Sequence, residues 1–349
     1  MKHILITDTH VDLKGGIDWH QKQHKRLYDI VFGFMEQHSI NSIIHLGDFF
    51  DSRKSPSTKS LKFVNDEFIN PLLDKQYNLT IITGNHDVYW KNTNSVNSLD
   101  LCLPKHPNIE IIDKPKLKYN TLMFPWVNSE NHDDVMDVLK SSTDVQMSMG
   151  HWEFSGFTMS KNGIPQNKGL NPSILSNIPR NLSGHFHGES KQVFDWGYVH
   201  YLGSTLQQDK HDLDDPKAFF VYDDETFEVV RVQHNIETFK KIILSYPDQE
   251  PEKCTDCFVF LDVMQGIKQS DIDKFKLKLY NFKPYSVIVD NNYNVVEMKD
   301  GRDGADLEKP QDMLELMSEF IDNVKIEHSD IDKDKLKDKM INLYNRVGT

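Results

Sequence analysis

The sequence has few cysteines and no long apolar run. Three cysteines in 349 residues are an odd set, so they do not make the paired framework that stabilises small secreted proteins. No segment approaches the roughly 18 apolar residues that a membrane-spanning helix needs. Met1 and Lys2 lead directly into a strand-like segment, which leaves no room for a signal peptide. We therefore expect a cytoplasmic protein that does not contact a membrane.

The sequence is also short of positive charge. Its 53 acidic residues outnumber 40 basic ones, and the formal net charge is -13. Domains that coat nucleic acid through bulk electrostatics are usually basic, so this balance argues against that class. It does not exclude an enzyme whose bound divalent cations make the field positive where a phosphate group must sit. With 38% hydrophobic residues, the chain can build one large domain and one or two small ones.

What the sequence does contain is a series of polar motifs, each at or just after an apolar run. In chain order they are Asp8-Thr9-His10, Gly47-Asp48-Phe49-Phe50-Asp51, Gly84-Asn85-His86-Asp87, Gly150-His151 and Gly184-His185-Phe186-His187. Each motif alone is weak evidence, because a lone polar residue after a strand more often belongs to a turn or the core. Carboxylate, imidazole and amide ligands without thiolates suit borderline divalent cations, and two such cations can clamp a displacement at phosphorus. Together the motifs predict a binuclear phosphoesterase.

Residue type and spacing predict the metal ligands. Asp48 is the candidate bridging carboxylate between two ions roughly 3.5 to 4 Å apart. Asp8 and His10 stand two residues apart at a strand end, so both can turn to one ion, and the second histidine pair has the same spacing. Asn85 offers a neutral oxygen, and His151 completes the second ion. The full set of predicted ligands is Asp8, His10, Asp48, Asn85, His151, His185 and His187.

Other side chains are expected to act around these ligands. His86 follows Asn85 and is expected to stand over the phosphate as a cation or as the general acid for the leaving oxygen. Asp51 and Asp87 are expected to orient the histidines, as carboxylates usually do behind an imidazole. The predicted catalytic residues are therefore His86 and Asp51.

Apolar periodicity predicts an α/β fold with alternating strands and helices. Helices are predicted over residues 19–38 and 57–75, between the strand-like runs that precede the motifs. From residue 192 onward, four strand-like runs indicate an antiparallel meander with a turn at Asp223-Asp224-Glu225. The pattern predicts a catalytic domain over residues 1–235, built as a two-sheet sandwich flanked by helices.

The remainder of the chain predicts two smaller parts. A polar break at residues 247–252 precedes a β-α-β unit, which indicates a small domain over residues 236–300. Residues 301–349 are predicted to be a linker followed by two amphipathic helices at 310–324 and 330–346. Their apolar stripes fit either packing on the protein itself or docking to a partner.

The motif set resembles that of the calcineurin-like metallophosphoesterase superfamily over roughly residues 1 to 205. The flanking residues are similar to those of the SbcD-type DNA repair exonucleases and of the phage recombination endonuclease subunits. These flanks include Ser52-Arg53-Lys54, Tyr89-Trp90-Lys91-Asn92, Pro125-Trp126, Trp152-Glu153 and Tyr201-Leu202-Gly203-Ser204. One departure is that cellular members of the group often have His where Asp51 stands, which weakens the role predicted for Asp51.

The resemblance implies a fold, a cofactor and ligand sets. The fold is a four-layer metallophosphoesterase sandwich, two mixed sheets flanked by helices, with a small α+β capping domain and C-terminal helices. The cofactor is two divalent metal ions, Mn²⁺ by preference and Mg²⁺ as the alternative. One ion would be held by Asp8, His10, Asp48 and His187, and the other by Asp48, Asn85, His151 and His185.

The same resemblance implies an activity and partners. The activity is 3'-to-5' exonuclease on duplex DNA and endonuclease on single strands, in recombination and double-strand break processing. The partners are DNA, a coiled-coil ATPase subunit bound by the C-terminal helices, and a second copy of the chain, packed near residues 57–73 and 93–103. A phage protein of this kind would act in the cytoplasm of its bacterial host.

The metal ligands indicate phosphoester chemistry but do not indicate the leaving group. A binuclear phosphatase or phosphodiesterase of small phosphoesters is therefore the alternative. A scaffold without activity is disfavoured, because every expected ligand position holds a competent residue.

Overall fold

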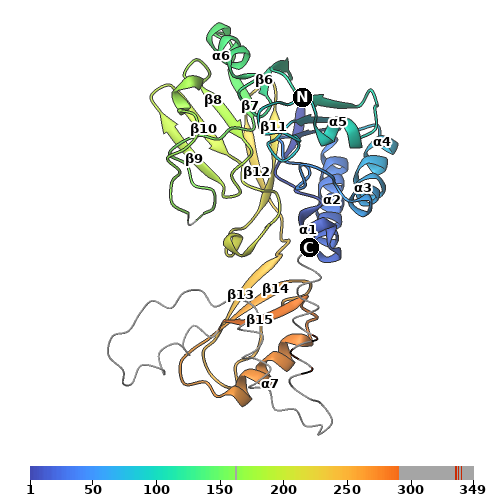
Figure 1. Cartoon of the computed structure of the whole chain (residues 1–349), viewed down its shortest axis with the longest axis vertical. Helices are drawn as coiled ribbons and strands as arrows, with labels where there is room; N and C mark the ends of the chain where they lie inside the picture. The colour runs from blue at the N-terminus through green and yellow to red at the C-terminus, as the bar shows by residue number, and fades with distance from the viewer. Residues whose placement is uncertain (162, 291–334, 336, 338, 340–349) are drawn as a thin grey trace. The chain divides into compact units, whose positions relative to one another are not determined.

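The computed structural model describes residues 1–161, 163–290, 335, 337 and 339. Within these residues, two six-stranded sheets and one three-stranded sheet are present (Figure 1). The first sheet has the order β12 (Val229–Gln233), β11 (Ala218–Asp223), β1 (Lys2–Ile6), β2 (Ser42–His45), β3 (Asn78–Ile82) and β4 (Ile109–Ile112). The second has the order β5 (Lys116–Lys118), β6 (Thr121–Phe124), β7 (Met147–Gly150), β8 (Arg180–Ser183), β10 (Gly197–Tyr201) and β9 (Ser190–Phe194).

Both six-stranded sheets are mixed. β1, β2, β3 and β4 run parallel to one another, and β11 joins β1 antiparallel. In the second sheet β6, β7, β8 and β10 are parallel, and β5 and β9 are antiparallel edge strands. The strands that precede the polar motifs, β1, β2, β3, β7 and β8, therefore all belong to the parallel parts of the two sheets.

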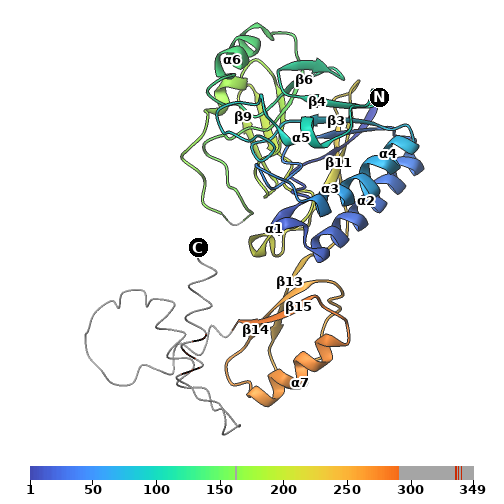
Figure 2. The same ribbon diagram turned by 45° about the vertical axis from the view of Figure 1, so that its right-hand side comes forward.

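Helices cover the outer faces of the sandwich. The helices of this body are α1 (Leu13–Gly16), α2 (Asp18–His38), α3 (Thr58–Val64), α4 (Asn70–Asp74), α5 (Ser98–Cys102) and α6 (His132–Ser141). A further helix, α7 (Gln269–Tyr280), packs instead on the three-stranded sheet. Helix α2 lies beside the segment formed by α3 and α4 (Figure 2), and both pack on the first sheet, whereas α6 packs on the second. Leu5 and Ile44 of the first sheet share the core between the sheets with Met149 and Leu182 of the second. The body is thus a four-layer sandwich of helices, sheet, sheet and helices, as the sequence predicted.

Consecutive residues of a strand point alternately to the core under the outer helices and to the core between the two sheets. Ile43 faces the helices of the outer layer, and Ile44 faces the opposite sheet. Because successive side chains of a strand point to opposite faces, a strand covered on both sides favours apolar residues at adjacent positions. This explains the adjacent apolar pairs Leu5-Ile6, Ile43-Ile44 and Ile81-Ile82 in the strands before the first three motifs.

The predicted helix over residues 57–75 is one continuous helical segment with a wide turn inside it. A π-helical turn, Asn65–Ile69, joins α3 to α4, and the N–H of Asn70 donates to the carbonyl oxygen of Asn65. Pro71 follows directly, and its ring would clash with the carbonyl group one α-helical turn earlier. The wider turn relieves that clash.

The predicted antiparallel meander after residue 192 is wrong. β9 and β10 form a hairpin in the second sheet, and β11 and β12 form another in the first. Two hairpins and one meander have the same local alternation of apolar and polar residues. They differ in the strands with which each hairpin pairs, and those strands lie far away in the chain. Tyr201 packs in the outer core of the second sheet, whereas Phe220 packs between the sheets. The patterns also did not predict β4, β5, β6 or α6.

The third sheet has the order β13 (Phe239–Leu244), β14 (Phe258–Val263) and β15 (Ser286–Asp290), with all strands parallel. Helix α7 connects β14 to β15, so the predicted β-α-β unit is present. The predicted C-terminal helices lie outside the described residues, apart from Lys335, Lys337 and Lys339, which are helical. Among the described helices, none combines the length and the apolar character that crossing a bilayer requires.

Phe68 gives a test of the helical layer behind the motifs. Its ring is fully buried, 4.7 Å from the ring of Tyr28 and 5.9 Å from that of Phe49, which follows Asp48. Phe68→Ala is expected to lower the free energy of unfolding by about 3–5 kcal/mol, because it leaves a cavity in the core. Urea denaturation measures this, with exposed Lys62→Ala as the control, expected within about 0.5 kcal/mol of the unchanged protein. Similar small losses in both variants would contradict the packing described.

Candidate metal centre

The polar motifs converge at the carboxyl ends of the parallel strands. The loops after β1, β2 and β3 come from the first sheet, and those after β7 and β8 come from the second. Because the parallel strands of one sheet end at the same edge, side chains placed just after them meet there. All of the predicted metal ligands lie in this one cluster.

A first ligand group comprises Asp8, His10 and His187. One ligand atom from each lies within 4.8 Å of the others. The Nε2 atoms of His10 and His187 are 3.2 Å apart. Two ring nitrogens at this separation can bind the same cation, so the arrangement suits a shared metal ion.

A second ligand group comprises Asp48, His151 and His185, again with ligand atoms within 4.8 Å of one another. Asn85 joins it, because its Oδ1 is 3.0 Å from Nε2 of His151 and 2.8 Å from Nδ1 of His185. One carboxylate, one amide oxygen and two imidazoles make a donor set of nitrogen and oxygen, without sulfur. That set fits a borderline or hard divalent cation.

Asp48 stands between the two groups. Its Oδ1 is 3.3 Å from Nε2 of His151 in the second group, and its Oδ2 is 3.7 Å from Nε2 of His10 in the first. The side chain is almost completely buried. The two oxygens of one carboxylate thus face the two ligand groups, which is the geometry that a bridging ligand requires.

Hydrogen bonds orient two of the histidines. Nδ1 of His151 is 2.8 Å from the carbonyl oxygen of Leu46, so the N–H lies at Nδ1 and the lone pair of Nε2 faces the ligand group. Nδ1 of His86 is 2.8 Å from the carbonyl oxygen of Asp51, which leaves Nε2 of His86 as the basic nitrogen. The side chain of His86 is one-third exposed, unlike the buried ligands.

Asp51, which was predicted to orient histidines, lies beside two of them. Its Oδ1 is 3.2 Å from Nδ1 of His10 and 3.7 Å from Nδ1 of His86. The rings of His10 and His86 meet edge to face with centres 4.9 Å apart. The carboxylate of Asp51 therefore lies next to His10 of the first ligand group and next to the exposed His86.

The prediction that Asp87 orients a histidine is wrong. Its carboxylate accepts the backbone N–H groups of Gly84, Asp48, Phe49 and Phe50 at 2.9 to 3.1 Å. Four backbone donors saturate a carboxylate and leave no acceptor for an imidazole. Asp87 instead shapes the loop that carries Asp48, whose φ of 55° lies in the left-handed region. The residue type of Asp87 and its position in the motif could not predict this role, because most of its partners are backbone groups of the loop after β2.

Two glycines allow the loops to approach each other. A Cβ on Gly84 would lie 2.2 Å from the backbone nitrogen of Asp48, and one on Gly47 would lie 2.4 Å from Nδ1 of His151. Gly47 also has a φ of 100°, which other residues rarely adopt. These positions need glycine because the ligand loops of both sheets are in contact there.

The cluster attracts positive charge. Burial raises the pKa of Asp8 to about 6. Burial alone would lower the pKa of His151, but the charge and the hydrogen bond of Asp48 outweigh it and raise this pKa to about 9. For His10 burial likewise acts to lower the pKa, and the carboxylates of Asp51 and Asp48 raise it to about 9. In the metal-free protein, protons on these side chains supply positive charge that two divalent cations would supply when bound.

Burial lowers the pKa of both His185 and His187 to about 3. Both are therefore neutral near pH 7 and present a free lone pair, which is the form that binds a metal. Trp126 covers this side, with its ring centre 5.3 Å from that of His185. Trp152 is in the core, with its ring stacked 5.4 Å from Phe154.

Comparison with known proteins identifies the class. Residues 1–196 match the family model of the calcineurin-like phosphoesterases, and the chain belongs to this family. The predicted resemblance to the superfamily is confirmed. The chain is also similar to exonuclease subunit 1 of Enterobacteria phage T4, with 28% identity over 330 residues that cover 93% of each chain.

Solved structures show weaker likeness. A dimetal phosphatase from Danio rerio is 13% identical, with a TM-score of 0.41, over 63% of this chain and 91% of that one. A novel archaeal phosphodiesterase is 14% identical, with a TM-score of 0.33, over 67% of this chain and 100% of that one.

The role of Asp87 can be tested by Asp87→Asn. The amide replaces one acceptor oxygen by a donor that would face backbone N–H groups. The free energy of unfolding of the metal-free protein is expected to fall by about 1–3 kcal/mol, the cost of leaving buried donors unpaired. Denaturant titration measures this change. The matched control is Asp133→Asn, whose side chain is 99% exposed, and an equal effect in both variants would refute the role given to Asp87.

Proposed function

We propose that this chain is the nuclease subunit of a two-metal DNA-processing complex. In this proposal it is a Mn²⁺-dependent 3'-to-5' exonuclease on duplex ends and an endonuclease on single strands. It acts with a coiled-coil ATPase in recombination and double-strand break processing, in the cytoplasm of a bacterial host. The observation that carries the phosphodiester chemistry is the position of Asp48, whose two oxygens face two separate ligand groups. The similarity to a phage exonuclease subunit favours DNA as the substrate.

We assign the ligands as the sequence predicted them. Asp8, His10, Asp48 and His187 hold the first ion, and Asp48, Asn85, His151 and His185 hold the second. Two divalent ions bound there would supply Lewis-acid polarisation of the phosphate and an activated water. The nitrogen and oxygen donors suit Mn²⁺ and also admit Mg²⁺.

His86 is the proposed general acid. The carbonyl oxygen of Asp51 holds its Nδ1–H, so Nε2 is the atom that can take and deliver a proton. Burial lowers the pKa of His86, which makes the free imidazole mainly neutral near pH 7. A phosphate anion beside Nε2 would favour the protonated form, which then donates to the leaving oxygen. Asp51 is proposed to be a positioning residue, because its carbonyl oxygen and its carboxylate both lie near Nδ1 of His86.

The other parts of the chain have proposed roles as well. Residues 1–235 are the nuclease domain, and residues 236–300, which include the sheet of β13, β14 and β15, are the capping domain that contacts DNA. Residues 301–349, of which the structure describes only three, are assigned to ATPase binding. A homodimer would form near residues 57–73 and 93–103.

Nuclease assays with site variants test the proposal. Purified protein with Mn²⁺ is expected to degrade duplex ends and cut single-stranded circles. His86→Ala is expected to lower cleavage by about 10²- to 10⁴-fold, the usual contribution of a general acid, while binding of both ions persists. Asp48→Asn is expected to lose cleavage together with metal binding.

The control for these variants is His38→Ala, at the exposed C-terminal end of α2, where the ring packs on Phe34 and not on a candidate ligand. Loss of DNA cleavage that is equal in all variants would contradict the assignment. Turnover of small aryl phosphodiesters much faster than DNA would favour the alternative phosphatase or phosphodiesterase.

Metal removal tests the ligand assignment without an activity assay. Chelation should lower the unfolding temperature, because bound cations neutralise the buried carboxylates. Titration of Mn²⁺ into the metal-free protein should restore it, with about 2.7 kcal/mol of stabilisation per site at a concentration of 100 times Kd. Calorimetry should show two ions for each chain. Failure of Mn²⁺ and Mg²⁺ to change the unfolding temperature would contradict the assignment.

A further inference from the structure

Lys217, the residue before β11, is buried and directly contacts a ligand loop. Only 4% of the residue is exposed. Its Nζ donates to the carbonyl oxygen of His187 at 2.7 Å and to the carboxylates of Asp212 and Asp215 at 3.0 and 2.8 Å. The three donors of the ammonium group therefore all have partners. One of the three is the backbone of a proposed ligand of the first ion.

The same network reaches a second ligand loop. Asp212, which is also buried, accepts the backbone N–H of Gln208 at 2.7 Å through its other oxygen. The side chain of Gln208 donates to the carbonyl oxygens of Asp8 and Thr9 at 3.0 and 3.4 Å. Lys217 and Asp212 thus connect the His187 loop with the loop that carries Asp8.

The loops held in this way need such support. Asp8 and His10 have φ values of 49° and 45°, in the left-handed region that is unfavourable for residues other than glycine. Strained backbone of this kind persists only where the surroundings determine it. The hydrogen bonds from Gln208 to the carbonyl oxygens of Asp8 and Thr9 help to hold the loop in this conformation.

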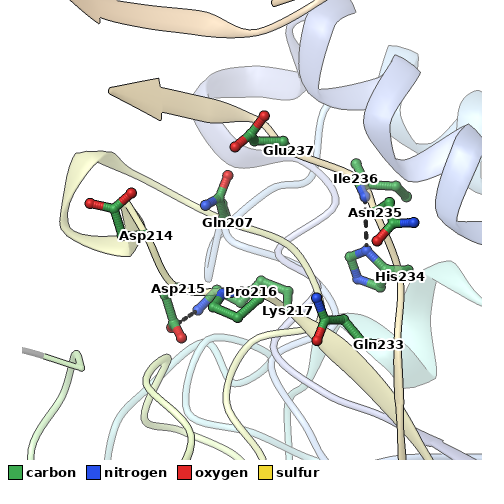
Figure 3. Close-up of a pocket in the computed structure, with 10 residues that line it drawn as sticks. All are labelled: Gln207, Asp214, Asp215, Pro216, Lys217, Gln233, His234, Asn235, Ile236 and Glu237. Carbon is green, nitrogen blue, oxygen red and sulfur yellow. Dashed lines mark hydrogen bonds and ion pairs between the residues drawn. The ribbon is translucent and has the colours of Figure 1, made fainter. Parts of the chain in front are cut away.

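The network borders a pocket on its other side. Figure 3 shows this pocket, of about 410 Å³, with Asp215 paired to Lys217 at its wall. Asp215 therefore contacts the ammonium group from the pocket side, whereas His187 contacts it from the side of the metal centre. This difference gives a matched pair of variants, because either contact can be changed separately.

We propose that Lys217 is a positioning residue for the first metal ion. Its ammonium group holds the His187 loop and, through Asp212 and Gln208, the Asp8 loop, so that the ligands of that ion keep their spacing. The second ion depends on Asn85, His151 and His185, whose hydrogen bonds do not involve Lys217, so it should be affected less. This inference rests on the ligand assignment proposed above.

The test compares three proteins: the unchanged chain, Asp215→Asn, and the double variant Lys217→Met with Asp215→Asn. The double variant removes one positive and one negative charge, so the net charge of the network is the same as in the unchanged protein. Asp215→Asn alone keeps the bond from Lys217 to His187. Stepwise Mn²⁺ binding is measured by calorimetry on the full chain, and circular dichroism with thermal unfolding establishes that each variant is folded. Low-temperature electron paramagnetic resonance reports whether the bound ions are exchange-coupled, as two ions sharing Asp48 would be.

The expected result is that Asp215→Asn binds both ions like the unchanged protein. The double variant should bind one ion about 10- to 100-fold more weakly, the usual cost of losing a group that orients ligands. At intermediate Mn²⁺ its spectrum should be that of a single uncoupled ion. Equal affinities for both ions in all three proteins, or an equal loss at both sites, would overturn the inference. If the unchanged protein itself binds no Mn²⁺, the ligand assignment fails and not this inference alone.

Discussion

The carboxylate of Asp48 is the contact on which the centre depends. It is the side chain that faces both ligand groups, and it can do so only because its loop has an uncommon backbone conformation. The carboxylate of Asp87 holds that conformation through backbone N–H groups, and Gly84 leaves the space in which it fits. The candidate bridging carboxylate therefore depends on buried polar groups that belong to neither ligand group.

The sandwich matters because neither sheet alone carries a complete ligand group. His151 follows a strand of the second sheet, yet it lies against Asp48 of the first and is oriented by the carbonyl oxygen of Leu46. The apolar core between the sheets sets the distance at which these loops meet. Packing between Leu5, Ile44, Met149 and Leu182 is thus a condition for the chemistry as well as for stability.

Charge is arranged locally in a chain that is acidic as a whole. With a formal charge of -13, the protein would repel a polyanion at long range. The buried cluster, in contrast, raises the pKa of two histidines and binds positive charge. Divalent cations at this place would create a small positive region at the strand ends, which is where a phosphate would be attacked.

The sequence by itself determined the parts of the centre that depend on residue type and local period. The strands β1, β2, β3, β7 and β8 and the motifs after them could be predicted because a strand buried on both faces is rich in apolar residues and because Asp, His and Asn are common ligands of divalent cations. The tertiary structure alone decided which hairpin joined which sheet, that Asp87 binds backbone, and that Lys217 holds the His187 loop. Those outcomes depend on contacts between residues far apart in the chain, such as His151 and Leu46, which are 105 positions apart. A local pattern contains no information on such partners, because their meeting is set by how the two sheets pack.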